Sequence, residues 1–237
     1  MAAGIKRRPT AELGAVGAGF NSSPLLQWLA SLDETASPAP PRHIAERLGQ
    51  WLDWTDAIAL SAALGAPAAS AVAGTLPPRV HSVQSACRQA RIDLDQAIRQ
   101  DVNTFPDLRA GSAGGSAEAV ADFAPYRSHC RRLQRKMEAR LGPLRAEVRA
   151  ALVAGSPALA QLAALDAVME HALAERAQHL LSTMTALLEH QFLRLPPPRQ
   201  AAFGTQIQEA LLAELDMRLQ PIEGLLDALG PAPDTTP

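Results

Sequence analysis

The segment HCRRLQRKMEARLGPLRAEVR, His129–Arg149, combines a regular spacing of apolar side chains with the densest positive charge in the chain. Between residues 126 and 154 the apolar positions recur every three or four residues, which places them on an arc of about 100° on one side of an α-helix. The spacing predicts an amphipathic helix, and Gly142-Pro143 is the point where it would kink. The apolar side is formed by Cys130, Leu133, Met137, Leu141, Leu144, Val148 and Leu152.

Composition and spacing extend this prediction to the whole chain. Of the 237 residues, 47% are hydrophobic but only 4% are aromatic. Ala and Leu supply most of the apolar mass and favour helices over strands. Further helices are predicted over about 43–64, 81–104, 156–195 and 206–229. Because each carries one apolar stripe, they must pack together, which predicts an all-α fold, an elongated helical bundle with long, partly coiled-coil-like helices.

Changes in composition divide the chain into three parts. Residues 1–42 lack a sustained helical period, and we expect a mobile N-terminus with one short helix. Residues 43–229 are predicted to form the helical bundle domain, with a flexible connector at about 105–118 where Gly and Ser cluster. Residues 230–237, which contain Pro and Thr, are expected to be a disordered tail.

The largest side chains on the apolar stripes are the candidates for helix-packing anchors. Trp51 and Trp54 of the segment WLDWTDAI could form a binding platform, but packing against other helices is the favoured interpretation. The complete set of predicted anchors is Trp51, Trp54, Leu133, Met137, Leu141, Met169, Leu173 and Leu180.

The sequence lacks the features typical of secreted and membrane proteins. Residues 1–20 contain no continuous apolar stretch like that of a secretion signal. The uncharged stretch 57–78 is interrupted by Gly65, Pro67 and Gly74, which argues against membrane insertion. Cys87 and Cys130 have no metal-binding or redox spacing, and both fall on apolar stripes. We therefore expect a cytoplasmic protein with two inert core thiols.

Charge is distributed unevenly along the chain. The net charge is −2, yet residues 127–149 hold eight Arg and Lys against two Glu, whereas residues 157–237 hold four Arg against ten Asp and Glu. Such asymmetry indicates an electrostatic contact, within the chain or with a partner. The predicted contact face consists of Arg127, Arg131, Arg132, Arg135, Lys136, Arg140, Arg145 and Arg149.

Three interpretations of this face stay open. It can be a solvated face that pairs with the acidic C-terminal helices, where each surface ion pair contributes only about 0–1 kcal/mol. It can bind the phosphates of a nucleic acid, although no aromatic residues or DNA-binding motif accompany it. It can also lie on a membrane surface, although its apolar side lacks the Trp and Phe of interfacial helices.

No catalytic motif or cofactor site is recognisable. The chain has no glycine-rich phosphate loop after a strand, no nucleophile elbow and no paired-cysteine motif. His171, Glu175 and His179 recur every four residues, but the two histidines lie about 12 Å apart along a helix, too far to share one metal ion. We expect a non-enzymatic protein without metal or cofactor.

Two segments of the chain resemble an uncharacterised bacterial family of unknown function. These are Ala45–Leu64, which contains the WLDWTDAI motif, and Leu159–Phe192; the basic segment Gln134–Leu152 matches as well. Members of that family are encoded beside a flagellar-stator-like motor protein and a peptidoglycan-binding partner, similar to Zorya-type anti-phage defence operons. The resemblance implies an assembly component with co-encoded partners, either stator-like motor components or a second cytosolic protein. It transfers no catalytic residues.

These observations support three hypotheses of function. The first is a non-enzymatic cytoplasmic assembly component of a Zorya-type defence complex, which contacts its partner through the basic face. The second is a nucleic-acid-binding protein that uses the basic helix 127–149. The third is a generic helical scaffold unrelated to defence. A homo-oligomer is compatible with each of them.

Overall fold

The computed structural model describes residues 53–65, 76–101, 122–196, 200 and 203–230. They form the helices α3 (Trp54–Gly65), α4 (Leu76–Asp101), α6 (Ala124–Val153), α7 (Pro157–Arg194) and α9 (Phe203–Leu229). The described part of the chain contains no strand, so the predicted all-α fold is confirmed. The predicted N-terminus 1–42, the connector 105–118 and the tail beyond Gly230 lie outside the described residues.

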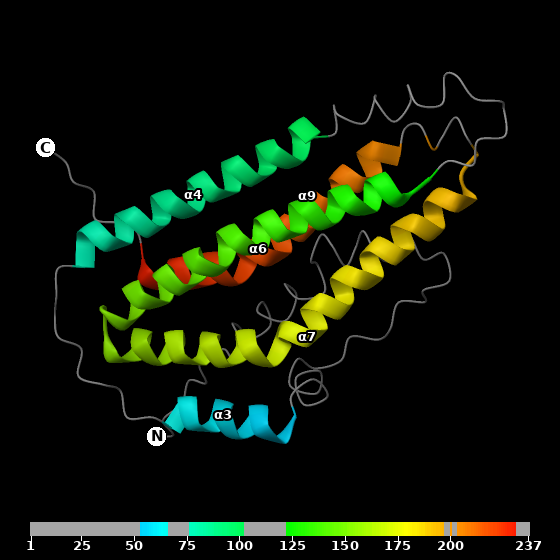
Figure 1. Ribbon diagram of the computed structural model, residues 1–237. Helices are drawn as coiled ribbons and strands as arrows, with labels where there is room; N and C mark the ends of the chain where they lie inside the picture. The colour runs from blue at the N-terminus through cyan, green and yellow to red at the C-terminus, as the bar shows by residue number, and fades with distance from the viewer. Residues whose placement is uncertain (1–52, 66–75, 102–121, 197–199, 201–202, 231–237) are drawn as a thin grey trace, which may run out of the picture.

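Helix α6 lies at the centre of an elongated bundle (Figure 1). It contacts α4, α7 and α9, while α4 also contacts α9 and α3 packs on α7. Successive long helices run in opposite directions, so α6 is antiparallel to both α4 and α7 (Figure 1). Within the described residues, no helix combines the length and the hydropathy that crossing a membrane requires.

The buried side of α6 is the one that the sequence predicts. All seven residues of its apolar stripe are at most 5% exposed, including Leu133, Met137 and Leu141. Helix α6 also continues through Gly142-Pro143 without ending. Pro143 cannot donate to the carbonyl of Ala139, but both residues are exposed, so water can bind that carbonyl.

Four aromatic rings hold one end of the bundle together. Phe123 and Tyr126 at the start of α6 contact Phe192 near the end of α7, and Phe203 begins α9. The ring centroids of Phe192 and Phe203 are 5.3 Å apart in an edge-to-face arrangement. The chain has only nine aromatic residues, so nearly half of them join the ends of three helices at one point. Such pairs contribute about 0.5–1.5 kcal/mol beyond the burial of their area.

Helix α7 begins where predicted but packs differently. The Ser156 hydroxyl accepts a hydrogen bond from the Leu159 amide, which caps the helix before Pro157. Near its middle α7 bends (Figure 1), and every residue of the span 174–179 is exposed. The hydroxyls of Ser182 and Thr183 both donate to the carbonyl of His179, at 2.8 and 2.9 Å, and such contacts favour bending.

The buried residues of α7 are not those that the sequence predicts. The core residues of this helix are Ala163, Met184, Leu188 and Phe192. The predicted anchors Met169, Leu173 and Leu180 are only half-buried and do not belong to the hydrophobic core. The prediction was wrong for them because the side that α7 buries is rotated around the helix from the stripe that they form.

The predicted anchor Trp54 also requires correction. Its side chain is 81% exposed and Ile58 is 52% exposed, and α3 has no buried residue. The side of α3 that packs on α7 carries Leu60 and Ala63, which are half-buried, and Trp54 lies on the opposite side of the helix. The other predicted anchor of this segment, Trp51, lies outside the described residues.

The aromatic cluster predicts the most sensitive position of the fold. Replacing Phe192 by Ala should lower the free energy of unfolding by about 3–5 kcal/mol, because the substitution leaves a cavity among three rings. The neighbouring Leu193 is 58% exposed, and Leu193→Ala should change the free energy by no more than about 0.5 kcal/mol. Denaturant unfolding measures both values. Equal losses for the two variants would contradict the cluster's role.

Candidate electrostatic contact surface

Two of the eight predicted contact residues are neutralised near the C-terminal end of α6. The Arg145 guanidinium binds Asp166 through both carboxylate oxygens, at 2.5 and 2.9 Å. Arg149 binds Glu170 at 2.5 Å and Asp166 at 3.0 Å. The side chains of Arg145, Arg149 and Asp166 are only 15, 20 and 10% exposed. Both arginines therefore join α6 to α7 and offer little charge to a partner.

A third predicted contact residue is neutralised at the opposite end of α6. Arg127 forms an ion pair with Glu189 of α7, and its guanidinium carbon also lies 5.9 Å from the centre of the Phe123 ring. For Arg127, Arg145 and Arg149 the acidic partners lie within the same molecule, so these residues make an electrostatic contact within the chain. This outcome agrees with the alternative of pairing with the acidic C-terminal half.

The antiparallel register explains why this pairing stops in the middle of α6. The facing positions of α6 and α7 have residue numbers that sum to about 315, as in Arg145 with Glu170 and Arg149 with Asp166. The same register places positions 184 and 180, Met184 and Leu180, opposite Arg131 and Arg135. Between Glu170 and Glu189, α7 carries a single acidic residue, Glu175. The middle of α6 therefore faces a segment of α7 that is nearly devoid of carboxylates.

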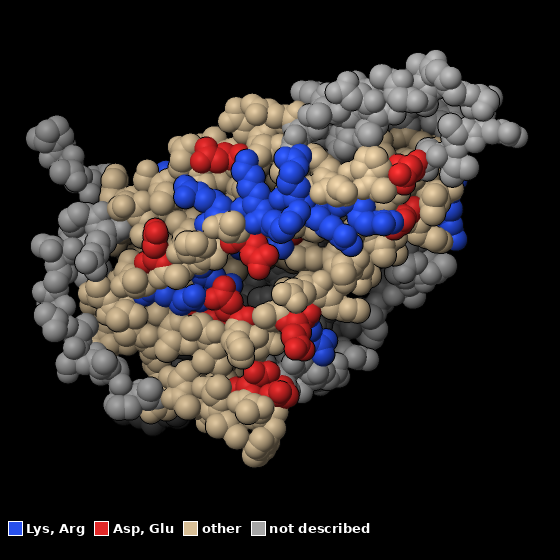
Figure 2. Space-filling model, in the orientation of Figure 1, with Lys and Arg blue, Asp and Glu red and all other residues tan. Residues whose placement is uncertain are grey.

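Four basic residues remain exposed on the middle of α6, and we call them the cationic ridge: Arg131, Arg135, Lys136 and Arg140. None of the four forms an ion pair with a carboxylate among the described residues. Arg135 donates only to the backbone carbonyl of Arg131, at 3.2 Å. Figure 2 shows the resulting band of positive charge across the face of the molecule that α6 presents.

The eighth predicted residue, Arg132, is held differently. It is exposed, but its guanidinium also lies 3.1 Å from the Nδ1 atom of His129, which is 9% exposed. We therefore leave Arg132 out of the ridge, although its charge adds to the local positive potential.

A buried carboxylate that the sequence did not reveal links α6 to α9. Glu214 is fully buried, and it accepts hydrogen bonds from the side-chain amide of Gln134 at 2.9 Å and from Arg218 at 2.8 Å. Burial, and to a smaller extent the charge of Glu214, raises the pKa of the nearby Cys130 thiol to about 12. Cys130 therefore stays protonated at neutral pH and packs as an apolar residue, as predicted.

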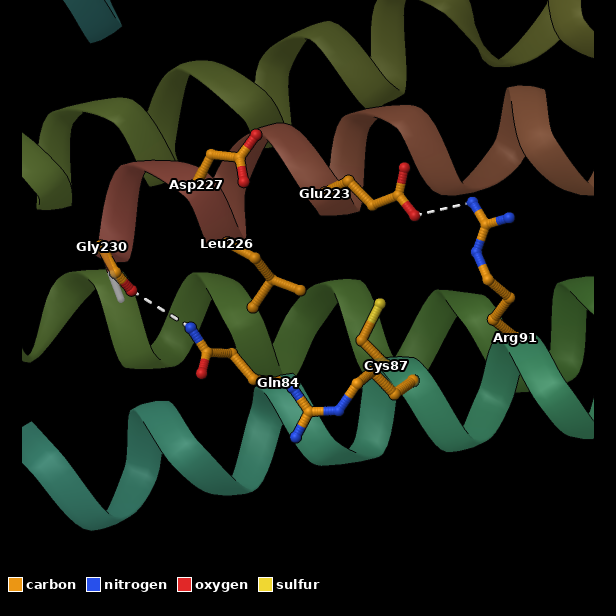
Figure 3. A pocket seen from close by; sticks show the side chains of 8 residues that line it. Gln84, Cys87, Arg91, Glu223, Leu226, Asp227 and Gly230 are labelled. Carbon is orange, nitrogen blue, oxygen red and sulfur yellow. Dashed lines mark hydrogen bonds and ion pairs between the residues drawn. The ribbon is translucent and has the colours of Figure 1, made fainter. Parts of the chain in front are cut away.

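A groove of about 590 Å³ between α4 and α9 contains the other cysteine (Figure 3). Arg91 spans this groove and binds Asp216 at 2.8 Å and Glu223 at 2.7 Å. Burial is the main cause that raises the pKa of Cys87, and none of the residues that line the groove is a histidine that could act as a base. The ion pairs of Arg91 in this groove join α4 to α9. The residues that line the groove include no activated nucleophile.

The described residues hold no other cluster that suggests chemistry. No group of three His, Cys, Asp or Glu among them could hold a metal ion. His171 and His179 are exposed and lie on the bent middle of α7. The exposed positive charge on α6 is thus the strongest candidate for a functional surface in the part of the chain that the structure describes.

The internal ion pairs and the ridge should respond differently to substitution. Asp166→Ala should lower the free energy of unfolding by about 1–3 kcal/mol, because it leaves two largely buried guanidiniums with a single carboxylate between them. Arg131→Ala should change it by no more than about 0.5 kcal/mol, because that side chain is exposed. Thermal and denaturant unfolding check both. A large loss for Arg131→Ala would show that the ridge is part of the internal framework.

Comparison with known proteins identifies a family but no characterised relative. Neither the curated proteins nor the solved structures provide a significant match to the chain. The sequence matches the family described as Protein of unknown function (DUF3348) over residues 15–202 and 196–231, which together span most of the chain. The resemblance to an uncharacterised family is thereby confirmed, and the chain belongs to the DUF3348 family.

Proposed function

We propose that this chain is a non-enzymatic assembly component that binds another protein through the cationic ridge. The observation that supports the proposal is the contrast along α6. Carboxylates of α7 neutralise Arg127, Arg145 and Arg149, whereas the four residues between them have no acidic partner among the described residues. A surface with this pattern fits an acidic partner.

The ridge lowers the stability of α6, and this unfavourable effect supports the proposed role. Arg131 and Arg135 are four residues apart, as are Lys136 and Arg140. Like charges at this spacing destabilise a helix by about 0.2–0.5 kcal/mol per pair. A helix that served packing alone would gain stability from acidic or neutral residues at these exposed positions. Clustered charge of one sign instead steers a complementary partner and fixes its orientation.

The resemblance of the sequence to its family suggests the setting. We propose a cytoplasmic protein whose partners are encoded beside it, either components of a stator-like motor system or a second cytosolic protein of a Zorya-type defence complex. The ridge supplies the positive charge in such a contact, and the partner supplies the negative charge. The helical fold without a reactive cluster in its described part suits an adaptor better than an enzyme.

Nucleic-acid binding through the same ridge is the second candidate function, and the four exposed cations on one helix favour it. A helix rises about 1.5 Å per residue, so Arg131 and Arg140 are about 14 Å apart along α6. This length allows contact with a few phosphates of one backbone.

Co-purification with the products of neighbouring genes tests the proposed assembly role. Partner recovery should fall at least about tenfold when Arg131 and Arg135 are both replaced by Glu, because two attractive contacts become repulsive. The matched control replaces Arg88 and Arg194, which are exposed on α4 and α7, by Glu, so that the net charge changes equally. Recovery of the wild-type chain as a monomer without a partner, or equal losses in both variants, would contradict the role.

A mobility-shift titration over a salt series tests the second candidate. If the four ridge residues each neutralise one phosphate of duplex DNA, the logarithm of the affinity should fall with the logarithm of salt at a slope of about −3.6. The Arg131→Glu, Arg135→Glu variant should reduce that slope. Absence of a shift at low salt ends the nucleic-acid candidate and leaves the assembly role as the only function for the ridge.

A further inference from the structure

We infer that the outer face of α6 binds a helix of the partner protein that is acidic in one half and apolar in the other. This inference rests on the proposed function and adds the kind of element that the ridge receives. It depends on a feature of α6 beyond its charge, which is the size of the exposed side chains that follow the ridge.

The outer face of α6 becomes nearly flat where the ridge ends. From Ala139 onward, the exposed positions on the outward side of the helix are occupied by small or short side chains, and they fall on the same side as the middle of the ridge. A Cβ atom added at Gly142 would meet nothing within 4 Å. We call this part the small-residue floor, and it consists of Ala139, Gly142, Pro143, Ala146 and Ala150.

The floor residues follow one line along the outer face of α6, and the basic side chains of the ridge lie on both sides of that line. Arg131 and Arg135 follow Arg127 at intervals of four residues, so they lie toward α7, whose Glu189 binds Arg127. Lys136 and Arg140 lie on the other side of Ala139, away from α7. A partner helix along α6 would therefore meet positive charge on both flanks at one end and a low surface at the other.

The charges beside the floor indicate the kind of residues that the second half of the partner helix carries. Arg145 and Arg149, which flank the floor, are neutralised by Asp166 and Glu170, and Glu147 is exposed beside it. A second acidic segment would be repelled there. A neutral, apolar helical segment can approach closely, because interaxial distances between helices fall toward about 8 Å when the contact residues are small.

The same observations favour a protein helix over a nucleic acid. A phosphate backbone continues its negative charge along its whole length, but the exposed positive charge of α6 ends at Arg140, and Glu147 follows. Small side chains contribute nothing to phosphate contact, whereas they allow two helix backbones to approach. The exposed residues of the ridge and the floor also include no aromatic ring on which a base could stack.

Fluorescence anisotropy with the full chain and a designed helical peptide tests the inference. The probe is a labelled peptide of about six turns, with Glu at i, i+4 spacing on one face of its first half and Ala and Leu on the same face of its second half. The control peptide has the same composition, but its Glu and apolar residues are mixed along the whole face, so that neither half is acidic alone or apolar alone. A duplex DNA of about 20 base pairs serves as the second probe, because it is longer than the ridge and the floor together.

Substitutions that introduce no new charge distinguish the contribution of the floor to peptide binding from that of the ridge. Ala146→Gln, which raises the floor, should weaken peptide binding at least about fivefold, and Arg131→Gln with Arg135→Gln at least about tenfold. Ala177→Gln is the matched control, because Ala177 is an exposed alanine on the bent middle of α7, and it should leave affinity unchanged. The control peptide should bind at least about tenfold more weakly than the probe.

Each contrary result has a distinct meaning. If the peptide does not bind, or if Ala146→Gln has no effect while the ridge variant does, the helix-binding inference is overturned, whereas ridge-dependent partner recovery would still support the assembly role. Tighter binding of the duplex than of the peptide also overturns it, in favour of nucleic acid. If the ridge variant affects neither the peptide nor partner recovery, both the inference and the proposed function fail.

Discussion

The antiparallel contact of α6 with α7 determines which charges of this protein remain available. Helix α6 buries an apolar stripe against its neighbours, so its basic residues must lie on the remaining sides. There α7 neutralises the two ends, through Glu189 and through Asp166 with Glu170. In between, α7 carries few acidic residues and bends. Arg131 and Arg135 keep their charge because the pairing of the two helices is interrupted, whereas Lys136 and Arg140 lie on the side of α6 away from α7.

Apolar and electrostatic interactions have different tasks in this bundle. Stability arises mainly from the buried stripe of α6 and from the aromatic cluster at the end of the bundle, where area removed from water dominates. The ion pairs and the buried Glu214 contribute less to stability than to register, since desolvation offsets much of their attraction. Gln134 binding to Glu214, and Arg145 binding to Asp166, each allow only one alignment of neighbouring helices. That alignment in turn fixes where the small-residue floor meets the ridge.

Local spacing predicted the helices and the stripe of α6 because both depend on residues close in sequence. The start of α7 at Ser156-Pro157 follows from capping chemistry in the same way. Spacing failed for Met169, Leu173 and Leu180, since the side that α7 buries is rotated around the helix from the stripe that they form. It failed for Trp54 because size alone does not say which side of a helix meets a neighbour. The division of the eight basic residues needed the register between α6 and α7, which no local pattern contains; the scarcity of acids between Glu170 and Glu189 was the available signal.

The central claim is that the ridge binds a partner because no carboxylate of the described residues neutralises it, and supplying one on α7 tests this claim most directly. Leu180 is half-buried, and the register set by the ion pairs Arg127–Glu189 and Arg145–Glu170 aligns its position with Arg135. The affinity of the Leu180→Glu variant for the co-purified partner should be compared with that of Leu180→Gln, which has nearly the same size but no charge. We predict that Leu180→Glu weakens partner binding by at least about fivefold relative to Leu180→Gln, because an internal ion pair then competes with the partner. Equal affinities of the two variants would contradict the account.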